Sequence, residues 1–254
     1  MPIFLSQTSH RPYPPPSGPW VMTQTWYNLL FAHWPIPVEV MRRAVPAALE
    51  LDTFDGQAWI GVVPFGMSRV YPRYTLAVPW LSYFLELNVR TYVTRDGKPG
   101  VYFFSLDAAN PLAVEIARRW YRLPYFNARM TMRPGLRETV DGWIDYHSVR
   151  THRNAPPGAF KGRYRPASAV FTSQPGTLEY FLTERYCLYT PGPNGQVYRG
   201  EIHHAQWPLQ IAQAEIEINT MTLPHGLQLP DGPPLLHFAR NIETVEWPIR
   251  PVAG

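Results

Sequence analysis

The stretch FLELNVRTYVTRDGKPGVYFFSLD, residues 84–107, decides the fold because its pattern is that of a β-hairpin. The dipeptide Asp96-Gly97 strongly favours the two-residue turn that joins two antiparallel strands. A loop of two or four residues centred on this dipeptide places Glu86 opposite Asp107. One face of the predicted hairpin is then apolar and is expected to be buried; it contains Leu87, Val89, Phe104 and Leu106.

The other face of this hairpin carries the predicted site. Glu86 and Asp107 are the candidate catalytic residues, because two carboxyl groups about 5 Å apart repel each other and, when buried, raise the pKa of at least one of them. We expect the pair to titrate as a coupled unit, so that Asp107→Asn lowers the pKa of Glu86 and leaves the fold intact. The candidate substrate-binding residues on this face are Asn88, Arg90, Tyr92, Phe103 and Ser105.

Two interpretations of this face remain open. Aromatic walls with a few polar groups are typical of small-molecule pockets, and the guanidinium of Arg90 has the fork geometry that binds a carboxylate. Alternatively, the face is a half-exposed sheet surface with scattered aromatic residues.

The remaining sequence predicts short elements, since 29 of the 254 residues are proline, which ends helices and avoids central strands. We expect a second hairpin around Asp55-Gly56, with residues 49–54 paired to residues 57–65. A helix is expected at 110–123, with Asn110 as its N-cap and with Leu112, Ile116 and Trp120 in an apolar stripe. A second helix is expected at 178–185, with Thr177 as its N-cap. A third, short helix is expected after Pro37. Further strands are expected at 26–37, 186–189 and 212–220. Short strands with few helices indicate a mainly antiparallel α+β domain.

Composition limits the other possibilities. Residues 1–20 form a proline-rich arm, and residues 21–254 are expected to form a single domain. The single cysteine excludes an intramolecular disulfide, and no cofactor or metal site is expected. The arginines are spread along the chain, which argues against nucleic-acid binding. No apolar stretch reaches the roughly 20 residues that cross a bilayer, and the first residues lack a signal-peptide pattern. We therefore expect a cytoplasmic protein; a homo-oligomer is compatible with the sequence.

Several segments together resemble a known family. They are WYNLLFAHWPIP (26–37), VPAALELDTFDGQAWIGVVPF (45–65), ELNVRTYV (86–93), PGVYFFSLDA (99–108) and GTLEYFLTERYCLYT (176–190). They resemble the YqjF-like family of uncharacterised bacterial proteins, which is in turn similar to acetoacetate decarboxylase. The resemblance implies a mixed, mostly antiparallel β-barrel or cone around a central cavity, flanked by a few helices.

The resemblance also implies where catalysis would take place. Acetoacetate decarboxylase forms a Schiff base through a lysine that follows a proline after the helix. Here Glu86 would be the strand glutamate, and the corresponding step reads Pro124-Tyr125-Phe126, without lysine. Tyr125 would then be a wall of the cavity. Amine catalysis requires a desolvated lysine, and Lys161 would have to reach the cavity from a loop.

These observations lead to one principal hypothesis and two alternatives. The principal hypothesis is a central cavity that binds a small carboxylate or another polar organic molecule; if the protein is an enzyme, its paired carboxyls suit enolisation, hydration or dehydration. The first alternative is a ligand-binding or sensor module without catalysis. The second is a decarboxylase or aldolase that depends on Lys161.

Overall fold

The computed structural model describes residues 3–134, 142–192 and 195–252. Its strands are β1 (Met22–Ile36), β2 (Glu50–Leu51), β3 (Ala58–Pro72), β4 (Phe84–Arg95), β5 (Lys98–Ala108), β6 (Tyr125–Arg133), β7 (Ile144–Arg150), β8 (Ala159–Pro166), β9 (Cys187–Pro191), β10 (Val197–His204), β11 (Leu209–Asn219), β12 (Leu235–Glu246) and β13 (Arg250–Pro251). Its helices are α1 (Val38–Ala44), α2 (Pro111–Trp120), α3 (Leu178–Thr183) and the 3-10 helices η1 (Ile3–Ser6) and η3 (Leu223–His225). None of the helices in these ranges is long and apolar enough to span a bilayer.

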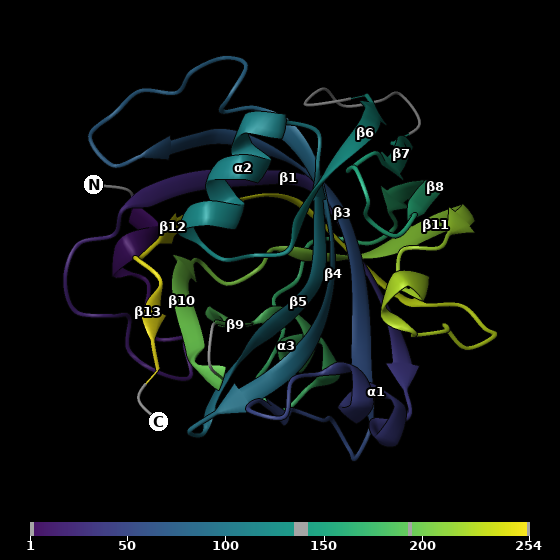
Figure 1. Ribbon diagram of the computed structural model, residues 1–254, viewed down its shortest axis with the longest axis horizontal. Coiled ribbons are helices and arrows are strands. Elements are labelled where there is room, and N and C mark those ends of the chain that lie inside the picture. The colour runs from purple at the N-terminus through teal and green to yellow at the C-terminus, as the bar shows by residue number, and fades with distance from the viewer. Residues whose placement is uncertain (1–2, 135–141, 193–194, 253–254) are drawn as a thin grey trace.

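The strands form one sheet that closes on itself in two rings. Strands β5, β4, β3, β1 and β12 are hydrogen-bonded in that order and form a shared wall. One ring closes from β5 through β6, β7, β8 and β11 back to β12, and the other closes through β9 and β10. Figure 1 shows these two groups of strands on opposite sides of β4. Apart from the parallel pairs β5–β6 and β5–β9, the pairing is antiparallel, as expected for this mainly antiparallel α+β fold.

The shared wall has an apolar core on each of its faces, because side chains alternate along a strand. One core contains Leu30, Val62 and Leu87. The other face carries a cluster with Leu29 and Val63, and a smaller cluster around Tyr92, Val101 and Leu182. We call this second face, which is enclosed by the ring through β9 and β10, the inner face. A wall buried on both faces also buries the polar residues of its strands, such as Glu86, Asn88 and Arg90 of β4.

The hairpin of β4 and β5 has the predicted turn. Asp96 and Gly97 both have positive φ angles, +54° and +70°, as a tight two-residue turn requires. Next to the turn the register is the predicted one, with Arg90 opposite Phe103.

Further from the turn, a β-bulge shifts the predicted register. Between Val89 and Arg90 the pairing moves by one residue, so Asp107 lies opposite Leu87 and Ser105 opposite Val89. The expected pairing of Glu86 with Asp107 is therefore wrong, since Glu86 lies opposite Ala108. The extra residue of a bulge transfers the following side chains to the other face. Asp107 and Ser105 consequently leave the inner face, and Leu106 joins it.

The predicted hairpin around Asp55-Gly56 is wrong in its pairing. Asp55-Gly56 does form a turn, but it closes only an isolated bridge between Phe54 and Gln57. The short strand β2 pairs with β4 instead of β3.

Helix α2 begins as predicted, because the Asn110 side chain accepts hydrogen bonds from the backbone N–H groups of Leu112 and Ala113. It ends at Trp120, three residues before the expected Leu123. The expected apolar stripe is also wrong, since Trp120 is 72% exposed and the buried residue is Val114. Helix α3 has the predicted cap at Thr177, and α1 follows Pro37 as predicted.

Candidate functional site

Six of the predicted site residues share the inner face. Glu86, Asn88, Arg90 and Tyr92 alternate along β4 and therefore point to one side. Phe103 lies opposite Arg90 on β5. The sixth is Tyr125, whose hydroxyl donates a 2.8 Å hydrogen bond to Oε2 of Glu86. The bulge removes Ser105 and Asp107 from this group.

Glu86 is a buried acid with a perturbed pKa. It is 3% exposed, and burial is the main cause that raises its pKa to about 8. Repulsion from Glu246 raises the pKa further, whereas hydrogen bonds from Tyr125 and Asn88 lower it. Asp107 contributes the smallest of these effects. Glu86 is therefore mostly protonated at neutral pH and can donate a proton.

Glu246, at the end of β12, is a site residue that sequence reasoning missed. Burial raises its pKa to about 8, and its charge also raises the pKa of Tyr125. Glu246 lies opposite Ile202 of β10 and Met22 of β1. Glu86 does have a second acid nearby whose charge raises its pKa, but this acid is Glu246, about 160 residues away in the sequence. No local pattern pointed to it, because its position depends on how the rings close.

Arg90 is a buried cation that forms no ion pair within the part of the chain that the structure describes. It is 8% exposed, and its Nη2 donates a 3.0 Å hydrogen bond to the carbonyl oxygen of Leu182. Its guanidinium lies 5.1 Å from the centre of the Phe31 ring. The Nε atom is buried and has no hydrogen-bond partner. Within the described residues, no carboxylate forms an ion pair with Arg90.

Aromatic rings connect Arg90 to further unpaired polar atoms. Phe31 packs edge-on against Trp207, with ring centres 4.9 Å apart, and Trp207 contacts His204 at 5.2 Å. The indole Nε1 of Trp207 and the Nε2 of His204 are buried without partners. His204 Nδ1 donates to the carbonyl oxygen of Ala205 at 2.7 Å, so its Nε2 is an acceptor in the neutral ring. Burial keeps that ring neutral by lowering its pKa to about 3.

His33 is fixed in a similar way. The Tyr92 hydroxyl donates to the carbonyl oxygen of Leu182 at 2.8 Å, so its proton is used. His33 Nε2, 2.6 Å from the same hydroxyl, must then be the protonated nitrogen. Its Nδ1 is left as a buried acceptor without a partner. Burial, followed by the nearby charge of Arg90, lowers the pKa of His33 and keeps it neutral.

Asp107 and Ser105 lie in the other core, on the opposite face of the wall. Asp107 forms a bidentate ion pair with Arg150, whose Nη2 donates to Oδ1 at 2.7 Å and whose Nε donates to Oδ2 at 3.1 Å. The two side chains are 0% and 1% exposed. Burial raises the pKa of Asp107, although Arg150 opposes this. The pair is a closed structural unit rather than part of the inner face.

Neither lysine reaches the inner face. Lys161 lies on β8 with its side chain 50% exposed and pairs with Glu217 at 2.5 Å. Lys98 follows the hairpin turn and pairs with Glu201 at 2.7 Å. At the position where the resemblance would require a lysine, Tyr125 contacts Glu86 instead. The alternative of a Lys161-dependent enzyme therefore has no amine at the site. Among the residues that the structure describes, no cluster of three His, Cys, Asp or Glu residues could hold a metal.

Comparisons with known proteins agree with this architecture. The model of the family DUF2071, described as an uncharacterized conserved protein, matches residues 23–243. The uncharacterized protein YqjF of Bacillus subtilis is 49% identical over 235 residues, which are 92% of this chain and 94% of the relative.

Solved structures share the fold at low sequence identity. The enduracididine biosynthesis enzyme MppR complexed with pyruvate has a TM-score of 0.61 and 10% identity, covering 94% of this chain and 92% of that one. An acetoacetate decarboxylase has a TM-score of 0.59 and 11% identity, covering 93% and 90%. The acetoacetate decarboxylase of Legionella pneumophila has a TM-score of 0.57 and 13% identity, covering 97% and 94%.

Proposed function

The chain belongs to the DUF2071 family of uncharacterized conserved proteins, and from this premise we propose that its inner face binds a small organic carboxylate next to the proton donor Glu86. The single observation that carries the proposal is Arg90. A buried guanidinium without an acidic partner is costly, because burying an unpaired charge is unfavourable. A carboxylate ligand would supply the missing charge and accept the unpaired Nε proton in a bidentate hydrogen bond.

Glu86 gives the bound molecule a group for proton transfer. It lies four residues from Arg90 on the same strand face, about 13 Å along β4 at 3.3 Å per residue. A carboxylic acid that is neutral at pH 7 can donate a hydrogen bond to a carbonyl oxygen or return a proton to an enolate. Enolisation, hydration or dehydration of a small oxo or hydroxy acid is therefore the reaction class we propose.

The structural relatives suggest which molecule to use as a probe. MppR, which is complexed with pyruvate in its solved structure, shares the fold at 10% identity. Pyruvate has the carboxylate that Arg90 would hold. Because Tyr125 replaces a lysine, the ligand would be held without a covalent bond.

A second candidate function is ligand binding without turnover. The hydrogen bond from Tyr125 to Oε2 of Glu86 favours it, because this bond already occupies one oxygen of the acid. In that case the inner face is a sensor site for the same class of anion.

The proposal is tested by thermal stabilisation of the protein with pyruvate and acetoacetate, each compared with acetone, which lacks the carboxylate. We expect the two anions to raise the melting temperature and acetone to leave it unchanged. Proton NMR of pyruvate in D₂O then separates the two candidate functions. Exchange of the methyl protons that is lost in Glu86→Gln indicates catalysis, and stabilisation without exchange indicates a sensor. If neither anion stabilises the protein, the proposal is wrong.

A further inference from the structure

A pocket of about 240 Å³ lies at the edge of the molecule, away from the inner face. It is built where the N-terminal arm meets strand β10 and the C-terminal strand β13. Ile202 of β10 lies opposite Glu246 and therefore shares its side of the sheet, the inner face. Arg199 and Glu201 lie an odd number of residues from Ile202 along β10, so they point to the opposite side, toward this pocket. The lining residues are Pro16, Ser17, Arg199, Glu201, Trp247, Pro248, Arg250, Pro251 and Val252.

The pocket has an excess of positive charge. Arg199 of β10 lies directly opposite Arg250 of β13, and like charges in that position repel each other. Glu201 Oε1 accepts from Arg199 Nε at 3.1 Å and from Lys98 Nζ at 2.7 Å. One carboxylate is thus shared by two cations. In the described ranges, no acidic side chain forms an ion pair with Arg250. Three cations and one acid leave this region short of an anion.

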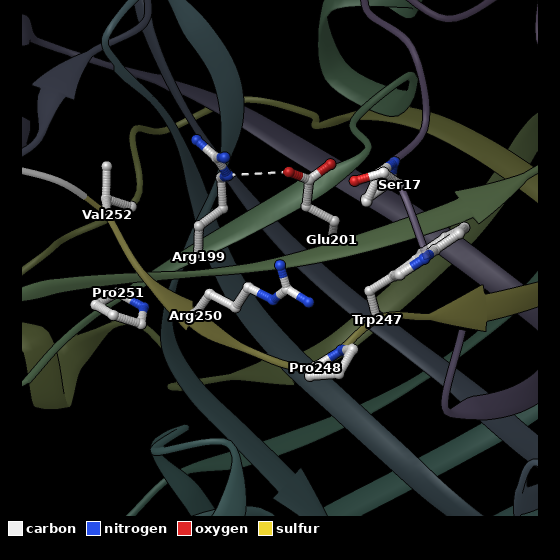
Figure 2. A pocket seen from close by; sticks show the side chains of 9 residues that line it. Ser17, Arg199, Glu201, Trp247, Pro248, Arg250, Pro251 and Val252 are labelled. Atoms are coloured by element: carbon white, nitrogen blue, oxygen red, sulfur yellow. Dashed lines mark hydrogen bonds and ion pairs between the residues drawn. The ribbon is translucent and has the colours of Figure 1, made fainter. Parts of the chain in front are cut away.

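One wall of the pocket is formed by Trp247, which is firmly held. Trp247 is 8% exposed, and its Nε1 donates to the carbonyl oxygen of Gly18 at 2.9 Å. Its backbone N–H donates to the carbonyl oxygen of Glu201, also at 2.9 Å. Figure 2 shows the Arg250 side chain extending into the space between Arg199 and Glu201 on one side and Trp247 and Pro248 on the other. A cation above an apolar wall suits a ligand with one anionic group and one apolar part.

We propose that this pocket binds a small organic anion, a carboxylate or phosphate ester with an apolar body, through the guanidinium groups of Arg250 and Arg199. Both anions match the fork of a guanidinium. The volume is below the 300–1,000 Å³ of typical drug-sized sites, so the ligand is small. Because Ser17 belongs to the arm and Arg250 to β13, a bound anion ties the arm to the C-terminal strand.

The test uses isothermal titration calorimetry with three probes of similar shape: benzoate, phenyl phosphate and neutral benzyl alcohol. We expect at least one of the two anions to bind saturably and benzyl alcohol not to bind. Arg250→Gln should weaken anion binding roughly tenfold or more, as expected for loss of a charge-assisted hydrogen bond. Arg129→Gln, on the exposed side of β6, is the matched control and should bind as the wild type does.

Two further measurements separate this pocket from the inner face. Arg90→Gln should leave anion binding here unchanged, and the anion should slow amide hydrogen exchange in residues 13–20. If only benzoate binds, the ligand class is a carboxylate, and if only phenyl phosphate binds, it is a phosphate ester. Either result supports the proposal. Absence of binding by both anions, equal binding by Arg250→Gln, or binding that only Arg90→Gln removes would overturn it.

Discussion

At Glu86, burial and hydrogen bonding act on the pKa in opposite directions. Burial and the repulsion of Glu246 raise the pKa, and the hydrogen bonds from Tyr125 and Asn88 lower it. Burial dominates, because the side chain is only 3% exposed. The acid is thus neutral in the folded protein up to a pH of about 8, whereas in the unfolded chain it ionises above its ordinary value of 4.5.

The first prediction concerns the pH dependence of stability. Between pH 4.5 and about 8 the folded state binds a proton at Glu86 that the unfolded state has lost, so stability falls as the pH rises. Glu86 contributes to this loss of stability throughout that window. Glu86→Gln removes this contribution, so the variant should gain stability relative to the wild type from pH 5 to pH 8. Urea unfolding at both pH values measures the gain.

Comparing the variant with the wild type measures the contribution of Glu86 together with its repulsion by Glu246, because the two acids are coupled. Parallel pH profiles for the two proteins would mean that Glu86 is an ordinary solvated carboxyl.

The second prediction reverses the expectation for Asp107. The sequence suggested that Asp107→Asn would relieve a repulsion, but the residue neutralises Arg150 in a fully buried pair. Removing one member of such a pair leaves an uncompensated buried charge, at a cost of about 3–5 kcal/mol. We expect this loss in urea unfolding at pH 7.

A matched control for Asp107 is available on the surface. Glu217→Gln breaks the Lys161–Glu217 pair, whose side chains are 50% and 62% exposed. It should cost no more than about 1 kcal/mol, as is usual for exposed pairs. Equal losses for Asp107→Asn and Glu217→Gln would show that burial does not decide the strength of the Asp107–Arg150 pair.

At the scale of elements, the β4–β5 hairpin shows what sequence can and cannot predict. Asp96-Gly97 identified the turn, because few dipeptides accept two positive φ angles. The extra residue of the bulge is Phe104, since Arg90 pairs with Phe103 and Val89 pairs with Ser105. The bulge could not be predicted, because Phe104 lies in a run of ordinary strand residues without a glycine. A single extra residue was enough to exchange Asp107 for Leu106 on the inner face. Turn chemistry thus fixes the register only as far as the first irregularity.

The third prediction tests the start of α2. Asn110 Oδ1 caps the helix, and its Nδ2 donates to the carbonyl oxygen of Trp80 at 2.7 Å. Asn110→Ala loses both interactions and should cost about 1 kcal/mol or more, the usual value of an N-cap. Asn110→Asp keeps the cap and loses only the bond to Trp80. Urea unfolding should therefore show a smaller loss for Asp than for Ala. Identical losses would assign the stabilisation to the Trp80 bond alone.

At the scale of the whole molecule, the two rings bring together residues from distant segments. The candidate residues of the hairpin were accessible to sequence reasoning because turn and alternation place them on one face. Glu246 and Trp207 were not, because only the ring that closes where β10 pairs with β12 brings them near Glu86 and Phe31. This part of the inner face depends on the order of the strands in the sheet, which local sequence patterns do not contain.

The measurement that tests the central claim most directly is calorimetric titration of pyruvate into wild-type protein and Arg90→Gln at pH 7. Circular dichroism first confirms that the variant is folded, and Arg129→Gln is the control, since it removes an exposed arginine. The account predicts saturable binding to the wild type and the control, and binding weakened roughly tenfold or more in Arg90→Gln, because the ligand's carboxylate loses its charged partner. Equal affinity in all three proteins, or no binding to the wild type, would contradict the assignment of the inner face as a carboxylate site.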